Sequence, residues 1–221
     1  MQEIRGIIMK YLYTKKELKK LESHIESEFG SCQKVIHELI SPDIHLDILI
    51  IPPNEENDFY ILVTLGAGAY KMNLPREIKD RNKFAHAEYV IFLPKEWNLE
   101  SEKQEDKWPV EQLRSIGRLA LQTDSWLAYR HTILANSDSS PLAENTGLNS
   151  FALLCAYNKN HKLTKPFKLG LFKTIRFYQL YPLYPEELDF KLENDMDALL
   201  DKIGDENLNP VVQIDRKNYC I

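Results

Sequence analysis

A histidine and an aspartate two residues apart are the first candidates for chemistry in this sequence. His45 and Asp47 lie in an alternating aliphatic segment, and side chains two apart on a strand project from one face. With a distant histidine, such as His86 or His131, this pair matches the ligand set of non-haem iron oxygenases. His86-x-Glu88 supplies a second pair of this kind. One hypothesis is therefore a metal-dependent enzyme.

A structural role for the same residues is the alternative. No arginine follows His131 at a convincing distance for binding the dicarboxylate cosubstrate of such oxygenases. A hydrogen bond from His45 to Asp47 or to a neighbouring strand would satisfy both side chains without a metal. We favour this interpretation, and we predict that the chain uses no metal and no other cofactor.

Other catalytic signatures are missing from the sequence. The glycines of Gly66-Ala67-Gly68 are not followed by the Lys-Ser/Thr of a phosphate-binding loop, and no Gly-x-Ser-x-Gly motif occurs. Cys32, Cys155 and Cys220 are far apart and have no metal-ligand spacing, which fits a reducing compartment. We predict a protein that is not an enzyme.

Composition narrows the class of protein. The 221 residues are 43% hydrophobic, which is enough for one sizeable core. The net charge of -5 repels polyphosphates, so nucleic acid is not an expected direct partner. The sequence has no apolar run long enough to span a membrane, and its start lacks the apolar core of a secretory signal. We expect a cytoplasmic protein with no membrane association.

Local patterns predict both helices and strands. Thr14 and Glu17 form a capping box before a helical repeat that ends at Gly30, and Pro109 and Pro185 are placed to be first residues of helices. Alternating or aliphatic runs predict strands over residues 44–51, 59–65, 87–93, 151–157 and 174–180. The predicted helices cover residues 14–30, 109–122 and 185–204.

The order of these elements is mixed and contains hairpins. It predicts an α+β fold with a mainly antiparallel mixed sheet and flanking helices in a single domain. We divide the chain into an N-terminal helical segment, residues 1–30, which packs on the main domain of residues 31–221.

A series of motifs resembles one known family. The motifs are Ile44-His45-Leu46-Asp47-Ile48, Pro52-Pro53, Tyr60-Ile61-Leu62-Val63-Thr64-Leu65-Gly66, Met72-Asn73-Leu74-Pro75, Ala87-Glu88-Tyr89-Val90-Ile91-Phe92-Leu93-Pro94, Trp108-Pro109, Gln179-Leu180-Tyr181-Pro182-Leu183-Tyr184-Pro185-Glu186-Glu187-Leu188 and Asp215-Arg216-Lys217-Asn218. In this order they resemble the suppressor of fused family, from about residue 35 onward. The chain departs from the family at Ala67 and Ala69, where members usually carry a small hydroxyl residue after the Thr-x-Gly motif.

The resemblance implies a protein-binding module. Bacterial members of similar length are inferred to be immunity proteins, so the implied partner is a toxin domain held in a one-to-one complex. A negative net charge suits the capture of a basic toxin.

The resemblance and the loop pattern together give two sets of site residues. The family-signature positions, for which we expect structural roles, are His45, Asp47, Thr64, Pro75, Glu88, Trp108 and Pro109. The partner-binding candidates are Glu55, Glu56, Asp58, Gly66, Gly68 and Met72. The three acidic residues cluster in a breaker-rich surface loop, where they could steer a partner.

Overall fold

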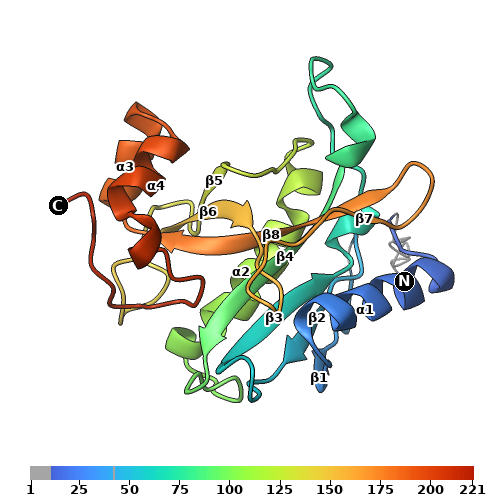
Figure 1. The fold of residues 1–221 in the computed structure, drawn as a ribbon, viewed down its shortest axis with the longest axis horizontal. Coiled ribbons are helices and arrows are strands. Elements are labelled where there is room, and N and C mark those ends of the chain that lie inside the picture. Colours follow the sequence, from blue (N-terminus) through green and yellow to red (C-terminus); the bar gives the residue numbers. More distant parts are fainter. Residues whose placement is uncertain (1–10, 42) are drawn as a thin grey trace, which may run out of the picture.

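A single mixed β-sheet forms the centre of the molecule in the computed structural model, which describes residues 11–41 and 43–221 (Figure 1). The strands are β1 (Lys34–Ile36), β2 (Asp47–Ile51), β3 (Phe59–Leu65), β4 (His86–Pro94), β5 (Thr132–Leu134), β6 (Ser150–Cys155), β7 (Phe167–Lys168) and β8 (Thr174–Leu183). Seven follow the order β1-β2-β3-β4-β8-β6-β5, and β7 pairs with the beginning of β8. Among these pairs, β4 with β8 is parallel and the others are antiparallel. The predicted α+β class is confirmed.

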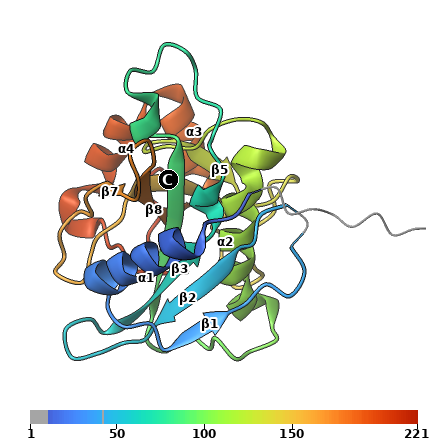
Figure 2. The same cartoon turned by 90° about the vertical axis from the view of Figure 1, so that its right-hand side faces the viewer.

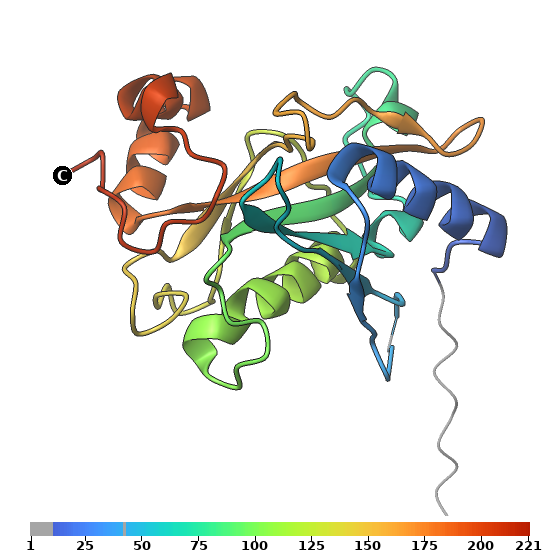
Figure 3. The same ribbon diagram turned by 60° about the horizontal axis from the view of Figure 1, so that its bottom comes forward.

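Helices cover both faces of the sheet. The α-helices of the described chain are α1 (Lys15–Phe29), α2 (Gln104–Gln122), α3 (Pro185–Glu193) and α4 (Met196–Ile203). Helix α1 lies on one face and α2 on the other, as Figures 2 and 3 show, while α3 and α4 lie together near the C-terminus. Residues 1–10 of the predicted N-terminal segment lie outside the described residues.

Strand β2 shows how the sequence pattern produces these layers. Ile48 and Ile50 pack in the core that contains α2, whereas Leu49 and Ile51 pack in the core that contains α1. Because successive side chains on a strand alternate between faces, a strand covered on both sides must be apolar throughout its length. The predicted interior position of this strand is confirmed, since β2 lies between β1 and β3.

Two predicted helix boundaries are wrong. Helix α2 begins at Gln104, so Pro109 lies inside the helix instead of at its first position. No side chain caps the start of α2, so the sequence contains no capping residue that would mark it. Trp108-Pro109 was therefore the stronger indication of where the helix begins. The predicted helix over residues 185–204 is two helices, because Asp195 caps α4 by accepting a hydrogen bond from the Ala198 amide at 2.8 Å. The capping box at Thr14 is confirmed.

Strands β1, β5 and β7 were not predicted. They have two or three residues each, which is too short for an alternating pattern to be recognised. Their positions depend on pairing with longer neighbours. None of the helices in residues 11–41 and 43–221 combines the length and the apolar composition that crossing a bilayer requires.

The close approach of α2 to the sheet generates a first prediction. A Cβ atom at Gly117 would lie 2.9 Å from the Leu46 Cδ2 atom, so the helix packs tightly at this point. We expect Gly117→Val to lower the free energy of unfolding by about 1–3 kcal/mol, because the added methyl groups overpack the core. Ser115→Val is the matched control, since Ser115 is exposed on the same helix. Urea denaturation that gives equal losses for both variants would contradict this packing.

Candidate functional site

The carboxylate of Glu88 lies fully buried at the centre of the sheet. It accepts hydrogen bonds from the Thr64 hydroxyl at 2.6 Å and the Tyr13 hydroxyl at 2.8 Å. The backbone amides of Gly66 and Gly68 each donate to it at 3.1 Å. One side chain on β4 therefore joins the segment that leads into α1, the end of β3 and the turn that follows β3.

Burial sets the protonation of this group. Desolvation raises the pKa of Glu88 to about 7, against the four hydrogen bonds, which favour the charged form. Burial and the neighbouring Glu88 also raise the pKa of Tyr13 well above its ordinary value, so its hydroxyl stays a donor. Thr64 on β3 makes a second contact with β4, because its hydroxyl oxygen also accepts a hydrogen bond from the Tyr89 amide at 2.8 Å.

The two glycine candidates lie inside this arrangement. Gly66 has a φ of 139°, and a Cβ atom there would lie 2.0 Å from the His45 carbonyl oxygen. A Cβ atom at Gly68 would lie 2.4 Å from the Tyr13 hydroxyl oxygen. Both residues are buried, and both amides face Glu88. The structure thus gives these glycines a role in the scaffold.

His86, at the start of β4, holds the backbone of residues 68–70 by hydrogen bonds. Its Nδ1 atom lies 2.8 Å from the Gly68 carbonyl oxygen and 3.1 Å from that of Tyr70, so this nitrogen donates. Burial lowers the pKa of His86, which keeps the imidazole neutral near neutral pH. The Met72 amide then donates to the Ala85 carbonyl oxygen at 2.8 Å. Residues 66–72 are therefore fixed along β4.

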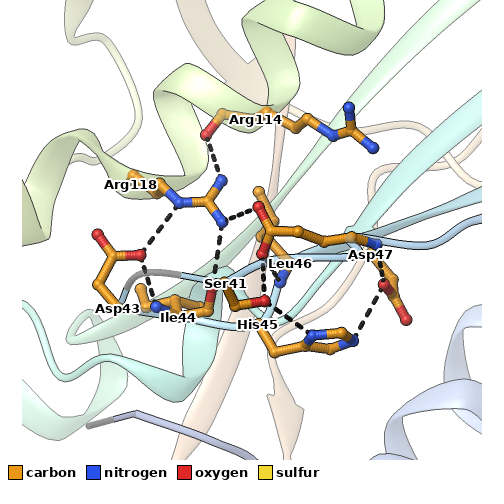
Figure 4. A network of polar contacts seen from close by, with 9 residues as sticks. Ser41, Asp43, Ile44, His45, Leu46, Asp47, Arg114 and Arg118 are labelled. Atoms are coloured by element: carbon orange, nitrogen blue, oxygen red, sulfur yellow. Dashed lines mark hydrogen bonds and ion pairs between the residues drawn. The ribbon is translucent and has the colours of Figure 1, made fainter. Parts of the chain in front are cut away.

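The expected contact between His45 and Asp47 is present (Figure 4). The His45 Nε2 atom lies 3.1 Å from Asp47 Oδ1, and its Nδ1 atom lies 3.0 Å from the Ser41 hydroxyl. Asp47 also contacts His37 Nδ1 at 3.0 Å and accepts from the Glu38 amide at 3.0 Å. These contacts order the segment that leads into β2.

The structure does not bring the proposed metal ligands together. Within residues 11–41 and 43–221, no group of three or more His, Cys, Asp and Glu side chains is placed to hold a metal ion. His86 is directed at the carbonyl groups of residues 68 and 70, and the ring of His131 packs against Trp126 at a centroid distance of 4.5 Å. The residues therefore do not fit the iron site considered from the sequence.

Two arginines to which the sequence assigned no role organise other parts of the chain. The buried Arg118 on α2 pairs with Glu38, donates to Asp43 Oδ1 at 3.1 Å and to the Ile44 carbonyl oxygen at 3.1 Å (Figure 4). It anchors the loop before β2 to the helix. In the sequence, the one sign of this role was that Arg118 lies near the apolar face of the helix predicted over residues 109–122.

The second arginine, Arg216, closes the C-terminal region. Its guanidinium donates to both carboxylate oxygens of the fully buried Glu187, at 2.6 and 2.5 Å, and to the Pro182 carbonyl oxygen at 2.9 Å. Rings of three tyrosines surround it; these are Tyr181, Tyr184 and Tyr219. The motif over residues 215–218 is thus a clamp on the start of α3.

The other predicted residues are spread over the molecule. Trp108 is fully buried against Trp97, whereas Pro75 is exposed at a turn. Asp58 pairs with Lys95 at 2.6 Å in the loop before β3, where Glu55 and Glu56 are also exposed. This loop lies at the opposite end of β3 from residues 66–69. Met72 is buried, and its sulfur accepts a hydrogen bond from the Leu127 amide at 3.3 Å.

Comparison with known proteins identifies the same family that the sequence motifs resemble. The family model described as suppressor of fused protein matches residues 42–217. No curated protein matches the sequence. A suppressor of fused homologue from Neisseria gonorrhoeae aligns with a TM-score of 0.63 at 15% identity, over 94% of this chain and 96% of that chain. A chain of the Sufu–Fu complex aligns with a TM-score of 0.61 at 14% identity, over 92% of each chain.

A third structure is longer than this chain. Drosophila Suppressor of Fused aligns with a TM-score of 0.54 at 14% identity, and 80% of this chain matches 43% of that one. At these identities the solved structures establish the fold alone.

Replacing Glu88 with glutamine removes its titration. An unfolded glutamate loses its proton near pH 4.5 and the folded one near pH 7, so the stability from Glu88 is largest below pH 4.5 and falls as the pH rises to about 7. We expect the unfolding free energy of the wild type to decline by about 3 kcal/mol across this range relative to Glu88→Gln. Urea denaturation at several pH values measures this. A difference between the two proteins that is constant with pH would show that Glu88 is ionised throughout.

The clamp around Glu187 gives another prediction. Arg216→Ala leaves a fully buried carboxylate without its cation, so we expect a loss of about 3–5 kcal/mol in unfolding free energy. The double variant Arg216→Met with Glu187→Met removes both charges, and it should lose less than Arg216→Ala. Thermal and urea unfolding of both variants decide the point; equal losses would mean that the arginine acts through packing alone.

Proposed function

Because this chain belongs to the suppressor of fused family, we propose that it is a non-enzymatic protein-binding module that holds one protein partner in a one-to-one complex. Within that role we propose an immunity protein, which neutralises a cognate toxin by binding it in the cytoplasm. The Neisseria gonorrhoeae homologue supports a bacterial-type member of this kind, since the alignment covers 94% of this chain and 96% of that chain.

The observation that carries the proposal is the exposure of large apolar side chains on a well-packed body. Leu39 and Ile40 are 95% and 85% exposed, and Leu171 and Phe172 are 89% and 69% exposed. Each pair is adjacent in the sequence and projects from a loop. Apolar side chains exposed together mark surfaces that another molecule covers.

The polar groups of the interior support the same role. The carboxylates of Glu88 and Glu187 and the guanidiniums of Arg118 and Arg216 are satisfied by groups of the chain itself. Groups arranged in this way stabilise a scaffold. The relative in the Sufu–Fu complex supports a binding role, since its fold covers 92% of this chain.

Neutralisation of a toxin is tested by co-expression. Candidate toxin domains from the neighbourhood of the gene are each expressed with the full chain, and growth and complex mass are measured. We expect restored growth and a one-to-one complex. If the toxin stays active with the chain in excess and no complex forms, the proposed function is wrong.

Variants of the exposed pairs test which surface matters. We expect either Leu39→Asp with Ile40→Asp, or Leu171→Asp with Phe172→Asp, to weaken the complex, because a charge replaces an apolar contact. Leu192→Asp is the matched control, since Leu192 is 64% exposed on α3. Binding that is unchanged in both double variants would show that exposed apolar side chains do not carry the function.

A further inference from the structure

A groove lies between the segment that follows β3 and the β7–β8 hairpin. It encloses about 840 Å³, which is within the usual size of binding clefts. Both walls belong to the end of the sheet where β4 and β8 begin (Figure 1). The lining residues are Lys71, Met72, Leu74, Ile78, Asp80, Arg81, Asn82, Lys83, Ala85, Lys168, Gly170, Leu171, Phe172 and Thr174.

Apolar side chains form the floor and one rim of the groove. Met72, Leu74 and Ala85 are 5%, 3% and 0% exposed, so they present a closed apolar floor. Leu171 and Phe172 project from the tip of the hairpin into solvent. A ligand that lay in the groove would contact buried and exposed apolar groups together.

A hydrogen bond and a cation–π contact tie the two walls to each other. The Arg176 Nε atom donates to the Lys83 carbonyl oxygen at 2.8 Å, and its guanidinium lies 4.2 Å from the centre of the Phe84 ring. The hairpin is closed by the Leu169 amide, which donates to the Lys173 carbonyl oxygen at 3.0 Å. The groove is therefore preformed, which lowers the entropy that binding costs.

The charge of the groove is opposite to that of the chain. Four cationic side chains line it, whereas Asp80 alone among its described lining residues carries a carboxylate. Asp80 pairs with Lys83 at 2.6 Å. Lys71 and Lys168 are exposed and form no ion pair within the described part of the chain. In a protein of net charge -5, the groove is thus locally cationic.

We propose that this groove binds an acidic, amphipathic segment of the protein partner, an inference that rests on the proposed function. Apolar side chains of the segment pack on Met72 and Leu74 and against Leu171 and Phe172. Its carboxylates pair with Lys71 and Lys168. Net charge governs approach over long range, while these unpaired lysines govern the docked contact.

The apolar floor favours a protein segment over nucleic acid. Phosphates would pair with the lysines, but an RNA backbone offers nothing to cover Met72 and Leu74. An amphipathic segment satisfies both parts of the groove at once. RNA binding is therefore an outcome that the test must distinguish.

Defined probes test the proposal with the full chain. The first is a fluorescent peptide of about twelve residues in which leucine and phenylalanine alternate with glutamate. The others replace glutamate with lysine, replace the apolar residues with serine, or are a single-stranded RNA of similar length. By fluorescence anisotropy we expect the glutamate peptide to bind roughly tenfold tighter than any other probe. If the serine peptide, the lysine peptide or the RNA binds as well, the proposal is overturned.

Matched variants locate the site. We expect Lys71→Glu with Lys168→Glu, and Leu171→Ser with Phe172→Ser, each to weaken the glutamate peptide by roughly tenfold. Lys103→Glu with Lys202→Glu makes the same change of charge at exposed positions outside the groove, and it should bind like the wild type at moderate salt. An equal loss in this control would overturn the groove assignment. Such a result leaves toxin neutralisation intact, because co-expression detects a complex wherever the partner docks.

Discussion

The carboxylate of Glu88 has left water completely, and such a group costs several kcal/mol unless donors surround it. Thr64 and Tyr13 donate through their hydroxyls, and Gly66 and Gly68 through their amides. Meeting this requirement fixes the turn after β3 and draws the start of α1 onto the sheet. Because this turn is fixed, Met72 lies beside the start of β4. The groove floor thus depends on a carboxylate that does not itself line the groove.

The sequence predicted those parts of the fold that depend on local pattern. Strand β2 was recognised because one of its faces is wholly aliphatic and the other turns from polar to apolar. The α+β class followed from the order of elements. The partners of Glu88 could not be predicted from spacing, since Tyr13 lies 75 residues away and two of the donors are glycine amides. The family resemblance marked Thr64 and Glu88 as signature positions without supplying the contact that joins them.

The buried guanidiniums have partners within the chain, whereas two lysines at the groove form no ion pair within the described residues. In the interior, Arg118 and Arg216 have carboxylate partners within the chain. At the groove, Lys71 and Lys168 are exposed beside buried apolar groups. The two lysines are visible in the sequence, but their positions on facing walls are not. The hairpin that carries Lys168 contains a strand of two residues, which is too short to be recognised from a sequence pattern. Internal pairing accounts for stability, and the groove supplies groups for a partner.

Native-state hydrogen exchange of the unbound chain tests most directly whether Glu88 holds the groove floor in place. The amides of Gly66, Gly68 and Met72 are the reporters, and that of Glu56 in the β2–β3 loop is the reference for an exposed segment. The account predicts that the three reporters exchange as slowly as the amides of β3 and β4, because they open only with the sheet. Exchange of the reporters as fast as that of Glu56 would contradict it, since the floor would then be ordered by something other than the buried carboxylate.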